Sequence, residues 1–147
     1  SFYESVKSRK ARLDESYSSY NGLDPSFQEG VSELKAMASN LDGFVREFNI
    51  VAGQILKSAR SLGLSLKRFH QDGPFNIEDA VRGSKIEFYF LFKITDLSGD
   101  EEQDYERIHD ACDSMMESLG RPQYGKLSVY ETHDGVGIDY DFSLRQQ

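Results

Sequence analysis

The longest regular pattern in the chain is a heptad repeat of apolar residues. One series of large side chains recurs every seven residues, and a second series, rich in alanine, follows each member by four. This spacing predicts one long helix over residues 25–62, ended by Gly63, with a break at 40–43 as the main alternative. The first series consists of Phe27, Leu34, Leu41, Phe48, Ile55 and Leu62, and the second of Val31, Ala38, Val45, Ala52, Ala59 and Leu66.

Shorter segments flank this long helix. Residues 2–20 place their apolar side chains mostly on one helical face and predict a first helix. Residues 64–75 have no clear period and predict a connecting segment. Residues 76–82 predict a short helix that begins at an asparagine cap and ends before a glycine.

The period of the apolar residues then changes from helical to alternating. Residues 85–95 alternate between large apolar and polar side chains, which predicts a half-buried strand. Residues 99–119 return to helical spacing, and Ser98 with Glu101 forms a capping box at the start. The opposite face of the helix over 99–119 is strongly acidic.

The end of the chain predicts a hairpin with strands at 126–132 and 136–144. Asp134 and Gly135 are the preferred residues of a two-residue type I′ turn, and this turn fixes the register. All large apolar side chains then lie on one face of the hairpin. The predicted pairs are Glu131 with Ile138, Val129 with Tyr140, and Leu127 with Phe142.

These elements predict an α+β protein in two parts. A helical segment, residues 1–72, precedes a small three-stranded βαββ sheet domain, residues 73–147. The apolar stripe of the long helix must be buried, because it is too wide to remain in water. Its partner is the first helix, the sheet or a second copy of the chain, and the spacing alone does not decide between them.

The net charge of −8 is distributed unevenly. Residues 1–82 contain 11 basic and 11 acidic side chains, whereas residues 83–147 contain 6 and 14, so the difference of 6 − 14 = −8 lies in the second part. This distribution disfavours general nucleic-acid binding and favours a basic partner. No stretch is long and apolar enough to predict a membrane span, and the single cysteine favours a reducing, cytoplasmic location, with removal of a leader as the open alternative.

Motifs that carry chemistry are sparse. Neither a nucleotide-binding glycine pattern nor the Cys/His spacing of a zinc site occurs, so no cofactor is expected. Cys112 lies on the apolar face of the helix predicted over 99–119, where it is expected to be a core residue with a raised pKa. The best candidate for metal or acid–base chemistry is the group at the final hairpin, although its members alternate between two faces. This group consists of Glu131, His133, Asp134, Asp139 and Asp141.

We therefore expect a non-catalytic interaction or assembly protein that binds a protein partner or itself as a homo-oligomer. The first alternative is an acidic inhibitor, similar in kind to an immunity protein or antitoxin, and the second is a small metal-dependent enzyme that uses the hairpin. In the leading hypothesis the polar strand face binds a partner, unless the long helix covers it. The candidate partner-binding residues are Phe27, Leu34, Leu41, Phe48 and Ile55 on the stripe, Tyr89, Leu91 and Tyr130 on the strands, and Glu102, Glu106, Asp110 and Asp113 on the acidic helix.

Overall fold

The computed structural model describes the backbone of residues 25–72 and 85–143, and the side chains of these ranges from residue 39 onward. The expected α+β class is confirmed. The predicted helices at 2–20 and 76–82 lie outside the described residues. The described elements are α2 (Pro25–Ser61), β1 (Leu64–Asp72), β2 (Lys85–Ile94), α4 (Glu101–Ser118), β3 (Lys126–Glu131) and β4 (Gly135–Ser143).

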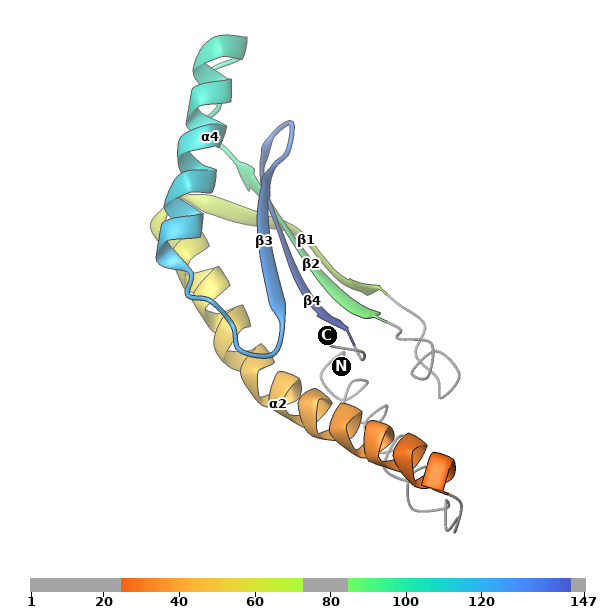
Figure 1. The fold of residues 1–147 in the computed structure, drawn as a ribbon. Helices are drawn as coiled ribbons and strands as arrows, with labels where there is room; N and C mark the ends of the chain where they lie inside the picture. The colour runs from red at the N-terminus through yellow and green to blue at the C-terminus, as the bar shows by residue number, and fades with distance from the viewer. Residues whose placement is uncertain (1–24, 73–84, 144–147) are drawn as a thin grey trace.

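The sheet has four antiparallel strands in the order β1-β2-β4-β3. The prediction of three strands was wrong, because part of the expected connecting segment at 64–75 forms β1. The described chain therefore repeats one arrangement, in which a helix is followed by two paired strands: α2 precedes β1 and β2, and α4 precedes β3 and β4. Pairing between β2 and β4 joins the two halves at the centre of the sheet (Figure 1).

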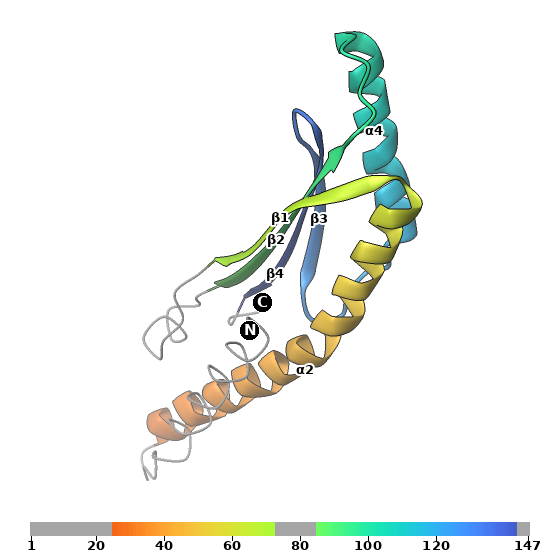
Figure 2. The ribbon, with the colours of Figure 1, turned by 180° about the vertical axis from the view of Figure 1, so that it is seen from behind.

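Both described helices lie on the same side of the sheet (Figures 1 and 2). They cover the apolar side chains that alternate along β2 and β4, so the core is a single layer between helices and sheet. The fully buried aromatic residues Phe44, Phe88 and Tyr140 belong to this layer, and the Phe44 and Tyr140 rings stack with centroids 4.9 Å apart. The face that α2 covers is therefore the apolar one, and the alternative in which the long helix covers the polar strand face is not observed.

Helix α2 is continuous, and the alternative of a break at 40–43 is not observed. Gly43 lies against the ring of Tyr124, and a Cβ atom at this position would come within 2.4 Å of that ring. The glycine is needed for this close approach, so it does not mark the end of the helix. The helix ends as predicted at Gly63, whose φ of +72° is a left-handed conformation that favours glycine.

The final hairpin forms, but its register differs from the prediction by two residues. Val129 pairs with Ile138, and the N–H of Thr132 donates to the carbonyl oxygen of Gly135 across the turn. The expected type I′ turn requires positive φ at both central residues, and the described chain has no non-glycine residue with positive φ. A shift by two leaves every side chain on its predicted face, so the apolar pattern is satisfied in either register.

Helix α4 begins two residues later than its capping box predicts. Asp100 is the N-cap, and its carboxylate accepts hydrogen bonds from the N–H groups of Glu102 and Gln103. Ser98 instead donates to the carboxylate of Asp104, which also accepts the N–H of Gly99. An aspartate satisfies the free N–H groups as well as a serine does, and its negative charge interacts favourably with the helix dipole.

Candidate functional site

The sheet face opposite the helices, here called the outer face, carries the candidate site. Side chains from several strands form rows across it, because directly paired residues in antiparallel strands point to the same side. One row joins Leu91 to Gly137 and Tyr130. The next row joins His70, Tyr89, Asp139 and Ser128, and the third joins Asp72, Glu87, Asp141 and Lys126.

Three carboxylates gather on this face around Lys85. The Lys85 ammonium lies 2.8 Å from a carboxylate oxygen of Glu87 and 3.8 Å from one of Asp141. The hydrogen bond from Lys85, together with one from Tyr89, lowers the pKa of Glu87. Burial raises the pKa of Asp139, and burial with the neighbouring Glu87 and Asp139 carboxylates raises that of Asp141 to about 6. The lysine therefore stabilises one carboxylate much more than the other two.

Two tyrosines position this group of carboxylates. The Tyr89 hydroxyl donates to Glu87, and its ring stacks on the imidazole of His70 with centroids 4.5 Å apart. The Tyr130 ring lies over Gly137, where a Cβ atom would come within 2.2 Å of it, and its hydroxyl donates to Asp139 at 3.0 Å. These contacts fix the aromatic rings beside the carboxylates, so both kinds of group are available on one surface.

Two polar atoms on the outer face are buried without a hydrogen-bond partner among the described residues: Oδ1 of Asp141 and Nδ1 of His70. A buried carboxylate oxygen without a donor costs free energy. The outer face thus contains an acceptor that the described part of the chain leaves unsatisfied.

The acidic residues predicted on α4 are exposed, and they face away from the outer face. Glu102, Glu106, Asp110 and Asp113 all lie on the solvent side of the helix. His109 connects this helix to the hairpin, because its ring nitrogens lie 2.8 Å from Glu131 and 3.4 Å from Asp113. Its hydrogen bond to Glu131 and the nearby Asp113 raise the pKa of His109.

The described stripe residues lie inside the protein. Leu41 and Ile55 are completely buried and Phe48 is 4% exposed, all within the core beneath the sheet. They are not available to a partner while the chain is folded. Leu34 and Phe27 belong to the part of α2 whose side chains are not described.

The group predicted at the final hairpin does not form one site. Asp139 and Asp141 lie on the outer face, whereas Glu131 contacts His109 of α4. Asp134 lies at the turn, where it forms an ion pair of 3.0 Å with Lys67 of β1. Among the described residues, no three His, Cys, Asp or Glu side chains are arranged to hold a metal ion.

Cys112 is buried in the core, as its position on the apolar face of α4 predicts. Burial raises the pKa of its thiol to about 11, with smaller contributions from Glu131 and Asp113. Its thiolate is therefore scarce at neutral pH, which makes it a weak nucleophile.

The sequence predicts His70 as a surface residue of a connecting segment, whereas it lies in β1 on the outer face. The signal that could have placed it is the return of apolar residues at Leu64, Leu66 and Phe69, which is weak because a bulge interrupts it. The carboxylates of the outer face were recognised only in part. Asp139 and Asp141 were assigned to the hairpin, and the pairing of Asp141 with Glu87 of β2 could not be foreseen from local patterns.

Comparisons with known proteins give no family for this chain. No family model matches it, and neither a curated protein nor a solved structure matches it significantly. Neither described helix is long and apolar enough to cross a membrane.

Proposed function

We propose that this protein is a non-catalytic protein-binding module that recognises a basic segment of its partner through the outer face. The observation that carries this proposal is the Asp141 carboxylate, which lies 3.8 Å from Lys85, whereas Glu87 lies only 2.8 Å from the same ammonium group. Asp141 lies in a group of three carboxylates, of which Glu87 takes the closest contact with Lys85. A lysine or arginine from a partner would donate to Asp141 and relieve the repulsion among the carboxylates.

The tyrosines supply the other half of such an interface. Tyr89 and Tyr130 combine a large apolar ring with a hydroxyl group, and tyrosine is enriched at the centres of protein interfaces. Leu91 lies in the same row as Tyr130 and is half-buried. These are the strand residues that the sequence suggested as anchors. Lysines flank the carboxylates, so the outer face as a whole is not acidic. A partner must therefore place its cation at the centre of the face, beside the carboxylates.

Two double variants distinguish this proposal from the inhibitor alternative, in which α4 blocks a basic site. Immobilised wild-type protein is used to capture partners from an extract of the cells that make it. The Tyr89→Ala/Asp141→Asn variant should lose the captured partner, whereas Glu102→Gln/Glu106→Gln on α4 should retain it. Circular dichroism and melting temperature check that both variants are folded.

The opposite result, loss only with the α4 variant, would favour the inhibitor alternative. Capture that neither variant changes would contradict both surfaces. Hydrogen exchange then checks the location directly, because a bound partner should slow exchange in β2 and β4 and leave the exposed side of α4 unchanged.

A further inference from the structure

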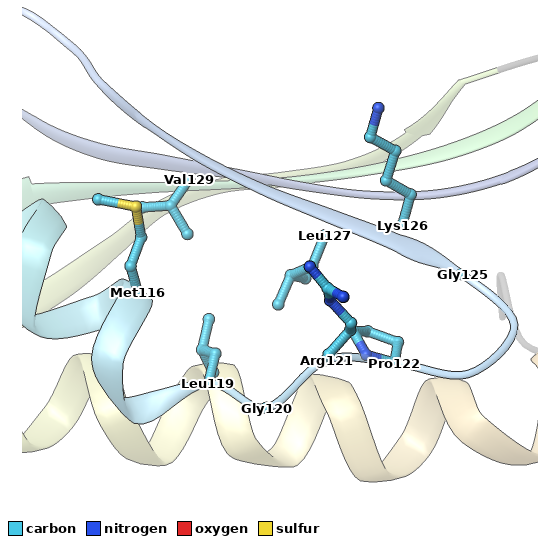
Figure 3. Close-up of a pocket in the computed structure, with 9 residues that line it drawn as sticks. All are labelled: Met116, Leu119, Gly120, Arg121, Pro122, Gly125, Lys126, Leu127 and Val129. Carbon is cyan, nitrogen blue, oxygen red and sulfur yellow. The ribbon is translucent and has the colours of Figure 1, made fainter.

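A pocket of about 530 Å³ opens where the C-terminal end of α4, the connection from α4 to β3, and β3 itself meet (Figure 3). Leu119 from the connection and Leu127 from β3 point into it, and Met116 lies beside Val129 at one end. These four side chains, with Pro122, form the apolar part of its wall. The pocket lies on the helix side of the sheet and is therefore separate from the outer face.

Arg121 supplies the charge of this pocket. In Figure 3 its guanidinium group points from the connection into the space beside Leu127, whereas the ammonium group of Lys126 points away to the other side of β3. Arg121 is exposed, and no ion pair joins it to a carboxylate among the described residues. A guanidinium group next to an apolar wall complements a ligand that carries one carboxylate beside an apolar group.

The wall of the pocket is held in position before any ligand binds. The carboxylate of Glu47 on α2 accepts the backbone N–H groups of Gln123, Tyr124 and Gly125 at 2.6 to 3.2 Å. Three consecutive N–H groups fixed by one carboxylate restrict the connection that carries Arg121. A site that is already ordered loses less conformational entropy when it binds.

The neighbouring strand offers a second means of recognition. Among the described strands β3 pairs only with β4, so it is an edge of the sheet and presents backbone N–H and C=O groups to one side. An extended peptide that pairs with this edge would direct alternate side chains toward the helix side, where the pocket lies. A free fatty acid would use the pocket and leave the edge unused.

We propose that the β3 edge and this pocket bind an extended peptide that inserts an apolar side chain between Met116 and Leu127 and places a carboxylate on Arg121. The carboxylate comes either from the C-terminus of the peptide or from an acidic side chain. This site is independent of the proposed function, because it lies on the other side of the sheet and uses different residues.

The probe is a synthetic library of random hexapeptides with free C-terminal carboxylates, applied to the immobilised protein beside the same library with amidated ends. We expect enrichment of peptides with alternating apolar residues. Enrichment confined to free ends identifies the C-terminus as the carboxylate source, whereas equal enrichment with conserved Asp or Glu identifies a side chain. Arg121→Gln should weaken the selected peptide at least tenfold, and Arg60→Gln, an exposed arginine outside the pocket, should not.

Further variants separate pocket from edge. Met116→Glu changes a half-exposed side chain, so the fold should survive, and it should abolish binding by placing a carboxylate at the apolar end. Two series of the selected peptide carry methyl groups on the backbone nitrogens of either the odd or the even positions. Methylation should block binding in one series and not in the other. If the wild-type protein enriched no more peptide than the Arg121→Gln variant, the proposed site would be overturned. Equal binding of both methylated series would overturn the pairing with β3. The Tyr89→Ala/Asp141→Asn variant should bind the peptide normally, which distinguishes failure here from failure of the outer face.

Discussion

Glu47 and Tyr140 are 93 positions apart in the sequence, and the hydroxyl group of Tyr140 donates a hydrogen bond to the carboxylate of Glu47. The same carboxylate accepts the backbone N–H groups of residues 123–125. One side chain of α2 therefore joins the middle of β4 to the connection between α4 and β3. Burial opposes ionisation here, but these hydrogen bonds outweigh it and lower the pKa of Glu47.

Replacing this carboxylate should destabilise the fold at neutral pH. Glu47→Gln leaves one acceptor oxygen in place of two and removes the charge, so N–H groups of the connection lose their partner. We expect a loss of about 1.5–3 kcal/mol in the free energy of unfolding, measured by urea denaturation at pH 7. Glu117→Gln on the exposed side of α4 is the control and should change it by less than about 0.5 kcal/mol.

Glu47 should also make stability depend on pH in the acid range. Its pKa in the folded protein lies below the unfolded value of 4.5, so the ionised form stabilises the fold. This contribution is fully present above about pH 4.5 and is lost as the pH falls through the folded pKa. Unfolding curves from pH 5 to pH 2.5 should show a smaller decline for Glu47→Gln than for wild type. Parallel declines would contradict this role.

Asp141 should have the opposite pH dependence. Its pKa rises from 3.8 to about 6 on folding, so its contribution to stability is present below pH 3.8 and is lost as the pH rises through 6. Asp141→Asn should be more stable than wild type at pH 7 by roughly 1 kcal/mol. This value is smaller than the full pKa shift implies, because the carboxylate is partly exposed to solvent and lies near Lys85. The difference between variant and wild type should shrink as the pH is lowered to 5, and a constant difference would show that the shift is absent.

Two glycines of α2 should respond in opposite ways to alanine. Gly53 has open space at the Cβ position, so Gly53→Ala should stabilise the helix by up to about 1 kcal/mol. Gly43 faces the ring of Tyr124, and Gly43→Ala should cost roughly 1–3 kcal/mol because the ring must move. Melting temperatures of the two variants test the pair, and a stabilising Gly43→Ala would refute the close packing.

The heptad stripe should behave as core. Ile55→Ala removes a completely buried side chain and should cost about 2–5 kcal/mol of stability. Ile50, on the same helix and 64% exposed, should tolerate alanine within about 0.5 kcal/mol. Denaturant unfolding at two protein concentrations tests both variants. If the loss at Ile55 were small, the stripe would not be packed against the sheet as described.

Strong periodic patterns allowed most described elements to be predicted. Strand β2 and helices α2 and α4 have long apolar series, and their boundaries are close to those expected. Strand β1 was missed because Lys67 is an extra residue in its ladder, where Leu66 pairs with Phe92 and Arg68 with Leu91. The bulge moves the apolar positions from even to odd numbers, so the alternation is lost from the sequence while the strand continues.

The partner of the apolar stripe could not be predicted for a different reason. Heptad spacing is satisfied by another helix or by a sheet, because either surface buries the same side chains. Leu41 and Ile55 pack against strands that lie far along the chain. The candidate site has the same limitation: Glu87 and Asp141 meet only through the pairing of β2 with β4, and no local pattern specifies that pairing.

The repeated order of one helix followed by two strands has a consequence for how the chain can be divided. The connection between β2 and α4 joins two halves that also meet through nine residue pairs between β2 and β4, through the shared core, and through polar contacts such as those of Glu47 and the Lys67–Asp134 ion pair. Cutting the chain there leaves each fragment with its own helix and its own pair of strands. Two fragments made separately should therefore reassemble by forming the β2–β4 ladder, much as two subunits of a dimer associate through a continuous sheet.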